Sequence, residues 1–228
     1  MIGPFVLVCL DMAGTTVRDD GAVESAFTVA LGAVGIVAGS PRDAEARAFV
    51  RDTMGWSKAD VFAQLLDPDD AARATDAFAA AYEATVAAGE VGEIPGALEV
   101  MRSLRSRGVR VCLTTGFAPS TRDALLDALG WRDEVDLALS PADVGRGRPA
   151  PDMVLGAMGR LGVDDPGTVA VVGDTVSDLE AGNRAGAGAV IGVLSGAHDE
   201  ATLAAAPHTA LIADVRGLLA VLESGSPR

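Results

Sequence analysis

The chain has 228 residues, 49% of them apolar, and its 18 basic and 32 acidic side chains give a formal net charge of −14. This length allows one sizeable α/β domain with a smaller inserted module and excludes two independent catalytic domains. The acidic balance, with no basic stripe, argues against a nucleic-acid partner. An aspartate interrupts the first apolar run at position 11, so we expect no signal peptide, no membrane partner and a cytoplasmic protein.

The first predicted strand covers residues 5–10 and ends in Asp11-Met12-Ala13-Gly14-Thr15-Thr16. Because the ligand crevice of a parallel sheet lies beyond the carboxyl ends of its strands, Asp11 is expected there on a rigid element. The loop that follows can hold an anion through its amides and hydroxyls, so Gly14 and Thr15 are candidate phosphate-binding residues. Aspartate is also a common turn residue, and Asp11 alone leaves that structural alternative open.

Residues 21–90 contain no predicted strand. Four alanine-rich, helically periodic segments fill this stretch, with glycine and proline between them: 22–35, 42–53, 57–66 and 69–88. A turn-type sequence at residues 94–96 suits a hinge back to the sheet. We therefore predict an α/β core domain of residues 1–16 and 95–228, with a helical cap domain of residues 17–94 inserted after the first strand.

Lys58 is the only lysine among the 18 basic residues. Arginine keeps its proton at any working pH, whereas a partly desolvated lysine can lose its proton and attack a carbonyl as a free amine. Met54 and Trp56 flank this lysine and could wall its pocket, so Met54 joins Lys58 as a candidate site residue. A solvated amine without a catalytic role is the alternative that the composition leaves open.

The remaining predicted strands alternate with helical segments, which is typical of a parallel sheet with helices on both sides. They cover residues 109–114, 136–139, 168–173, 189–193 and 209–212. The strand at 109–114 ends in Thr114, Thr115 and Gly116, whose hydroxyls and backbone amides suit phosphate oxygens. These three residues are therefore candidates for phosphate binding at the same sheet edge as Asp11.

A pair of aspartates follows the strand at 168–173. Asp174 comes directly after it, and Asp178 lies four residues later across a strand-to-helix turn. Together with Asp11 these carboxylates predict a hard oxygen site for Mg²⁺. Turn and helix-cap roles are the structural alternatives for each aspartate. Strand-end signals that all face one crevice favour the catalytic interpretation over those roles.

The chain resembles the haloacid dehalogenase superfamily over nearly its whole length, through the ordered motifs DMAGTT, LTTG, an isolated basic residue before proline, and VVGDTVSDLEAG. The resemblance implies a Rossmann-like parallel sheet with an inserted all-α cap of the C1 type. It also implies a nucleophile at Asp11, a phosphate-binding Thr114, and Mg²⁺ held by Asp11, the Ala13 carbonyl and Asp174, with Asp178 in support. Most phosphatases of that superfamily carry an aspartic acid at the position of Ala13, and a methyl group cannot protonate a leaving alcohol.

Within that superfamily the chain resembles the phosphonatase, or phosphonoacetaldehyde hydrolase, branch. That branch has the DxAGT motif, a cap segment similar to Met54-Gly55-Trp56-Ser57-Lys58, and an arginine that matches Arg148 before Pro149. The resemblance implies that Lys58 forms a Schiff base with an aldehyde next to a phosphonate, while Asp11 takes the phosphoryl group and Arg148 balances its charge. Such a leaving group needs no acid at position 13.

Three positions differ from the phosphonatase pattern: Val61 replaces a histidine, Phe117 replaces a tyrosine, and Ala150-Pro151-Asp152 lacks aromatic residues. We predict a Mg²⁺-dependent hydrolase of a small phosphonate or phosphorylated metabolite, with phosphonoacetaldehyde-type C–P cleavage favoured. Open alternatives are a phosphatase for a small phosphomonoester such as phosphoglycolate, and a weakly catalytic phosphate-ester-binding protein. The resemblance also suggests a homodimer formed through the cap.

Overall fold

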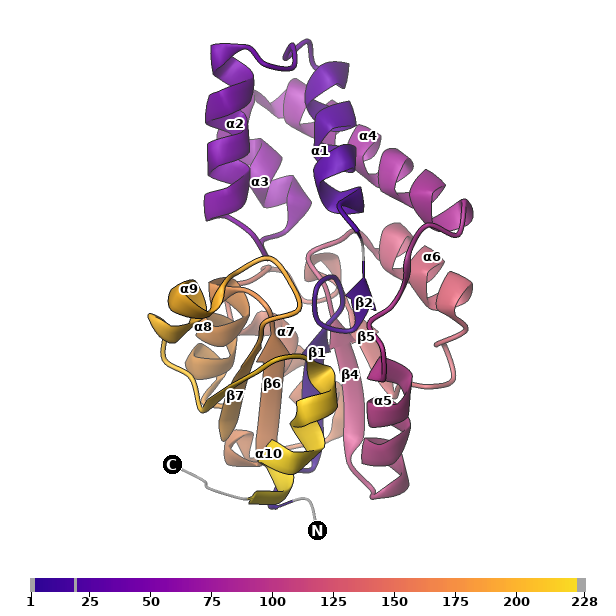
Figure 1. The fold of residues 1–228 in the computed structure, drawn as a ribbon, viewed down its shortest axis with the longest axis vertical. Helices are drawn as coiled ribbons and strands as arrows, with labels where there is room; N and C mark the ends of the chain where they lie inside the picture. The colour runs from indigo at the N-terminus through magenta and orange to yellow at the C-terminus, as the bar shows by residue number, and fades with distance from the viewer. Residues whose placement is uncertain (1–2, 19, 225–228) are drawn as a thin grey trace.

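The computed structural model describes residues 3–18 and 20–224. Within them lies a sheet with the strand order β5-β4-β1-β6-β7-β8, in which neighbouring strands run parallel (Figure 1). The α/β fold class predicted from the β-rich runs is confirmed, and the strands lie close to their predicted positions. Their bounds are β1 (Leu7–Asp11), β4 (Arg110–Thr114), β5 (Leu137–Leu139), β6 (Val169–Gly173), β7 (Ala189–Val193) and β8 (Ala210–Ile212).

Alternation along the strands directs side chains into two helical layers. Val8 and Leu10 of β1 pack in one cluster with α5 (Ala97–Ser106), whereas Leu7 and Cys9 pack in a second cluster with α7 (Asp152–Leu161). Every residue of β1 is therefore buried, as expected for a central strand covered on both faces. The remaining helices around the sheet are α6 (Pro119–Leu129), α8 (Val176–Ala185), α9 (Glu200–Ala204), α10 (Leu218–Ser224) and the 3-10 turns η1 (Pro141–Asp143), η2 (Pro166–Thr168) and η3 (Val215–Gly217).

Four helices lie beyond the carboxyl edge of the sheet, and we call them the helical module (Figure 1). Three of them begin at a side-chain cap, where Ser40, Ser57 and Asp67 each accept a hydrogen bond from the backbone N–H three residues later. The module consists of α1 (Ala22–Ala33), α2 (Pro41–Asp52), α3 (Lys58–Leu65) and α4 (Pro68–Ala87), close to the predicted helical segments.

Among residues 3–18 and 20–224 no helix is long and apolar enough to cross a membrane.

Two short strands mark where the chain enters and leaves the helical module. β2 (Val17–Arg18) pairs antiparallel with β3 (Gly92–Glu93). Neither strand was predicted, because two residues are too few to show an alternating pattern. The two crossings lie close to the predicted boundaries at 17 and 94, and the division into core and cap domains stays a prediction.

A line of aromatic rings connects the helical module to the sheet. Phe27 of α1 contacts Phe78 of α4, with ring centroids 4.8 Å apart, and Tyr82 of α4 contacts Phe117 of the loop after β4 at 4.5 Å. Close to this contact, the Thr121 hydroxyl of α6 donates to the Glu83 carboxylate of α4 at 2.8 Å. These contacts seat the module on the loop that follows β4.

Candidate active site

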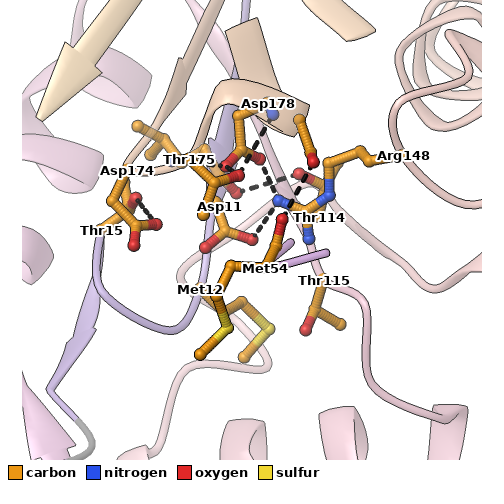
Figure 2. Close-up of polar contacts among 12 residues, drawn as sticks. Asp11, Met12, Thr15, Met54, Thr114, Thr115, Arg148, Asp174, Thr175 and Asp178 are labelled. Carbon is orange, nitrogen blue, oxygen red and sulfur yellow. Dashed lines mark hydrogen bonds and ion pairs between the residues drawn. The ribbon is translucent and has the colours of Figure 1, made fainter. Parts of the chain in front are cut away.

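Three buried carboxylates meet at the carboxyl edge of the sheet (Figure 2). Asp11 ends β1, Asp174 follows β6, and Asp178 lies in the first turn of α8. One oxygen from each of them lies within 4.8 Å of the others. This carboxylate cluster can hold a metal ion, and oxygen ligands of this kind suit a hard divalent cation such as Mg²⁺. The strand-end rule therefore brought the three predicted aspartates together correctly.

Arg148 is the cation of this cluster. Its Nη1 donates to the Asp11 carboxylate at 2.6 Å and also to Asp178 (Figure 2). The other oxygen of Asp178 accepts from the Thr175 backbone N–H at 3.1 Å and from the Thr175 hydroxyl at 2.5 Å. The Nε of Arg148 is buried and has no hydrogen-bond partner in residues 3–18 and 20–224. With one guanidinium facing three carboxylates, the buried space is left with excess negative charge.

Burial and the neighbouring charges together shift the pKa values of these groups. Burial raises the pKa of Asp11 well above its ordinary value, against the lowering effect of Arg148. Burial, together with the nearby carboxylate of Asp178, raises the pKa of Asp174 to about 6. Burial also lowers the pKa of Arg148, but the charges of Asp11 and Asp178 outweigh it and the pKa is raised. The cluster thus carries its full negative charge at a cost, which a bound divalent cation would relieve.

Mg²⁺ binding is expected to weaken as the pH falls below about 6. A carboxyl whose pKa is raised to about 6 is mostly protonated below that pH, and the cation must then displace the proton. The apparent affinity should fall about tenfold or more per pH unit below pH 6, because Asp11, whose pKa is also raised, can add a second proton that the ion must displace. Calorimetric titration with Mg²⁺ at constant ionic strength, from about pH 5 to pH 8, measures this dependence. An affinity that does not change over this range would contradict binding at Asp174.

The loops on either side of Asp174 hold its two oxygens. The Thr15 hydroxyl donates to Oδ1 at 3.1 Å, and the Ala197 backbone N–H donates to Oδ2 at 2.7 Å. Gly14 also lies against this carboxylate, with φ near +88°, and a Cβ added there would come within 2.3 Å of Asp174 Oδ2. The glycine of the DMAGTT motif is therefore required both by its backbone conformation and by the closeness of Asp174.

Gly14→Ala is expected to displace the Asp174 carboxylate and weaken Mg²⁺ binding by about tenfold or more, because second-layer contacts typically affect metal affinity by that amount. Gly35→Ala is the matched control. Gly35 also has a positive φ, near +77°, but an added Cβ would meet nothing within 4 Å. Both variants should lose about 1–2 kcal/mol of stability from backbone strain. Equal Mg²⁺ affinity in the two variants would show that Gly14 does not position Asp174.

A segment of the helical module, residues 54–58, crosses this sheet edge, and we call it the strap. At one end the Met54 carbonyl accepts from the Ser177 hydroxyl of α8 at 2.9 Å. At the other end the Lys58 backbone N–H donates to the Gly116 carbonyl after β4 at 3.2 Å. A Cβ on Gly116 would lie 2.4 Å from the Trp56 carbonyl oxygen, so the strap rests directly on this glycine.

Lys58 is buried, with 8% of its surface exposed, although it is a charged residue type. Its Nζ lies 5.4 Å from the centroid of Phe27, 5.8 Å from Phe78 and 5.6 Å from Phe117. Lys58 and Asp11 both line one cavity of about 550 Å³ between the helical module and the sheet edge. The predicted amine and the predicted nucleophile therefore face the same space.

Most of the predicted site residues line this cavity, and three do not. Thr114, Asp178 and Thr15 are not among its lining residues. The Thr114 hydroxyl donates to the Leu10 carbonyl at 3.5 Å, and the Thr15 hydroxyl donates to Asp174. Asp178 is nevertheless part of the carboxylate cluster. The predicted residues that do line the cavity are Asp11, Ala13, Gly14, Met54, Lys58, Thr115, Gly116, Arg148 and Asp174.

Sequence reasoning missed two groups of cavity residues. One is the loop after β7, from Ser195 to His198, in which burial lowers the pKa of His198. The strand-end rule could have found this loop, because it follows the carboxyl end of another parallel strand. The other group comes from the helical module and its entrance, and it includes Arg18 and Arg51. Nothing in the local sequence distinguishes these two arginines from solvated ones.

The carboxylate cluster at the carboxyl edge of a parallel sheet agrees with the family comparison. A family model for haloacid dehalogenase-like hydrolases matches residues 5–186. The chain belongs to this family of hydrolases, as its motifs predicted.

Curated relatives carry phosphatase and phosphonatase names. "Probable phosphatase IndB" of Dickeya dadantii is 34% identical over 205 residues, 88% of this chain and 86% of that protein. A phosphonoacetaldehyde hydrolase of Latilactobacillus sakei is 32% identical over 202 residues, 78% of this chain and 72% of that enzyme. The match to the phosphonoacetaldehyde hydrolase of Bacteroides fragilis, at 34% identity, spans 56% of this chain and about half, 48%, of that protein.

The solved structures confirm the fold. A phosphonoacetaldehyde hydrolase-like protein from Oleispira antarctica superposes with a TM-score of 0.79 at 24% identity, covering 100% of this chain and 97% of that one. A hydrolase from Pseudomonas syringae reaches a TM-score of 0.83 at 24% identity, with coverage of 96% and 98%. At this level of identity the likeness concerns the fold alone.

Proposed function

We propose that the protein is a Mg²⁺-dependent phosphonatase-like hydrolase that cleaves the C–P bond of a small carbonyl phosphonate of the phosphonoacetaldehyde type. The observation that carries this proposal is the buried amine of Lys58 in the same cavity as Asp11. A nucleophilic carboxylate alone would serve any phosphoryl transfer, whereas a buried amine beside it serves a substrate with a carbonyl group. The names of several relatives agree with this chemistry.

The residues around Asp11 have different roles in phosphoryl transfer. Asp11 attacks phosphorus, and Arg148, bonded to it at 2.6 Å, balances charge on the transferred group. Thr115 and Gly116 line the cavity and offer polar atoms to phosphoryl oxygens, as do the amides of the Gly14 loop. Mg²⁺ held by Asp11, Asp174 and the Ala13 carbonyl, with Asp178 in support, would neutralise the phosphoryl oxygens and orient them.

Lys58 forms the imine that accepts the electron pair of the breaking C–P bond. Its neutral amine condenses with the aldehyde, releasing water and forming a protonated imine. When Asp11 takes the phosphoryl group, the electron pair of the C–P bond moves to carbon and neutralises the iminium nitrogen, which gives an enamine. A proton then adds to the enamine carbon, and one water returns the amine and releases acetaldehyde. A second water hydrolyses the aspartyl phosphate, so phosphonoacetaldehyde and water give acetaldehyde and phosphate overall.

The methyl group of Ala13 fits this route. General-acid help to a leaving alcohol is worth roughly 10² to 10⁴ in rate, and Ala13 cannot supply it. The enamine leaves as a neutral group and needs no such acid at the moment of C–P cleavage. We also propose that the helical module acts as a cap over the reaction and that the protein can form a homodimer through that module.

A phosphomonoesterase acting on a compound such as phosphoglycolate is the second candidate function, and the surroundings of Lys58 favour it. Three aromatic rings lie within 6 Å of Nζ, an arrangement that attracts a cation. A lysine held in its charged form would bind a substrate carboxylate and could not attack a carbonyl. In this case Lys58 would bind the substrate and take no part in covalent chemistry. Binding of a phosphate ester without turnover would instead indicate a phosphate-ester-binding protein.

Phosphate release with Mg²⁺ present separates these functions. The purified protein is given phosphonoacetaldehyde, phosphoglycolate or ethylphosphonate, which has no carbonyl group. C–P cleavage through an imine requires release from phosphonoacetaldehyde and none from ethylphosphonate. Release from phosphoglycolate, with phosphonoacetaldehyde left intact, would replace the first proposal by the second.

A further inference from the structure

The cavity extends beyond the reacting groups toward the helical module. Its outer wall contains Arg18 and Asp20, which pair with each other at 2.9 Å, together with Glu24 of α1 and Arg51 of α2. The loop after β7 contributes His198. At about 550 Å³ the space lies within the range of sites for ligands much larger than a two-carbon phosphonate.

Arg51 is the cation of this wall for which the described residues provide no partner. Its side chain forms no ion pair or hydrogen bond with any residue in 3–18 and 20–224, whereas Arg18 is paired with Asp20 and Arg148 with Asp11. A guanidinium stays charged at any working pH and presents a planar set of donors that matches a carboxylate. An unpaired arginine in the wall of a reaction cavity is suited to bind an anionic part of the substrate.

His198 offers a second donor in the lining of the cavity. Its Nδ1 accepts a hydrogen bond from the Val176 backbone N–H at 3.0 Å. Since Nδ1 is the acceptor, the hydrogen of the neutral ring lies on Nε2, which makes this atom a donor. The ring lines the cavity, so Nε2–H is the polar group of His198 left for a ligand.

Hydrogen bonds connect the segments that carry Arg51 and His198 to the start of α8. The Met54 backbone N–H donates to the Arg51 carbonyl at 3.3 Å, and the Met54 carbonyl accepts from the Ser177 hydroxyl. His198 is bonded to Val176, the preceding residue. The segments that carry the two donors therefore meet α8 near the Met54 end of the strap, whereas Lys58 is at the other end, on Gly116.

We propose that Arg51 and His198 form a second anion subsite, and that the natural substrate carries a carboxylate besides its phosphonate and carbonyl groups. This inference rests on the proposed function, because it takes the phosphonate to lie at Asp11. It narrows the substrate class from a simple aldehyde to an acidic carbonyl phosphonate. Glu24 also lines the outer wall and is the side chain that would instead favour an ammonium group.

Binding of three matched probes tests the subsite by calorimetry with Mg²⁺ present. The probes are ethylphosphonate, 2-carboxyethylphosphonate and 2-aminoethylphosphonate, which differ in the group at the far carbon. We expect the carboxylate to improve affinity over ethylphosphonate by about tenfold, since a charge-assisted contact at a partly exposed site is worth about that much. The amino group should bring no gain.

Variants then assign the gain to its residues. Arg51→Gln should remove most of the tenfold gain and leave the affinity for ethylphosphonate unchanged. Arg42→Gln is the matched control, because Arg42 is exposed on the same helix and does not line the cavity. His198→Phe should remove a smaller part, about threefold, and His198→Gln, which keeps a donor, should retain it.

The outcomes separate this inference from the proposed function. If ethylphosphonate binds and the carboxylate adds nothing, or if the amino probe binds most tightly, the anion subsite is wrong and the phosphonate site stands. If the gain persists in Arg51→Gln, the subsite lies elsewhere and this assignment fails. If no probe binds to the Mg²⁺-loaded protein, the phosphonate site and the subsite both fail.

Discussion

Replacing Lys58 by arginine is expected to lower the turnover of phosphonoacetaldehyde by about 10³-fold or more, because arginine keeps the positive charge and cannot form an imine. The measurement is phosphate release at saturating Mg²⁺, together with intact mass after borohydride reduction in the presence of phosphonoacetaldehyde. Lys58 is the only lysine of the chain, so a reduced adduct can form elsewhere only on the N-terminal amine. An adduct found in the natural protein and absent from Lys58→Arg therefore locates the imine without peptide mapping.

The controls for this experiment guard against misfolding. The larger guanidinium must fit among Phe27, Phe78 and Phe117, and overpacking of a buried site typically costs about 1–3 kcal/mol. Glutamine is smaller than arginine, so Lys58→Gln should lose the same activity and unfold at the same temperature as the natural protein. Turnover of phosphonoacetaldehyde by either variant at more than about a tenth of the natural rate would refute Schiff-base catalysis.

Asp11→Asn is expected to abolish phosphate release from every substrate, by about 10⁴-fold or more, because the amide cannot accept the phosphoryl group. The same variant should still form the borohydride-reducible adduct at Lys58, since the amine does not depend on the carboxylate for its attack. Quenched-reaction mass spectrometry should show a phosphorylated form of the natural protein and none of Asp11→Asn. Lys58→Arg and Asp11→Asn would thus separate imine formation from phosphoryl transfer.

Stability of the metal-free Asp11→Asn variant provides an independent check. Burial raises the pKa of Asp11 in the folded protein, so folding favours its protonated form and its charge opposes folding as the pH rises above the unfolded pKa. Asparagine removes that charge, and Arg148 keeps its second partner, Asp178. The variant should therefore unfold at a temperature no lower than that of the natural protein at neutral pH. Asp52→Asn, at an exposed position at the end of α2, serves as the control for the substitution itself.

Retained phosphate release by Asp11→Asn, at a rate near that of Asp52→Asn, would show that the nucleophile is another residue. Asp174 would then be examined first, because it lines the cavity and lies in the same cluster. A large loss of stability in Asp11→Asn would instead show that the pairing with Arg148 outweighs the cost of burying the charge.

Local pattern was sufficient to predict the sheet and the carboxylate cluster. β-rich runs followed by helical segments define a parallel sheet, and such a sheet delivers the end of each strand to one edge whatever the detailed packing. Asp11, Asp174 and Asp178 therefore met as predicted. Lys58 could be selected from the sequence because it is the single lysine, and its family resemblance pointed to the same residue.

Contacts between distant segments could not be predicted in this way. Thr114 was expected to face phosphate, but its hydroxyl donates to Leu10 on the neighbouring strand, and Thr115 lines the cavity instead. Arg51 and His198 lie 147 positions apart in the printed sequence, and both line the cavity. His198 is bonded to Val176 at the start of α8, and the segment after Arg51 is bonded to the same helix through Met54 and Ser177. The direction of a side chain depends on the partners that packing brings to it, whereas the position of a strand end depends on hydrophobic periodicity along the chain. Residue type and periodicity thus specify the fold and the carboxylates at the sheet edge, and packing of the helical module against that edge specifies the cavity and the side chains that line it.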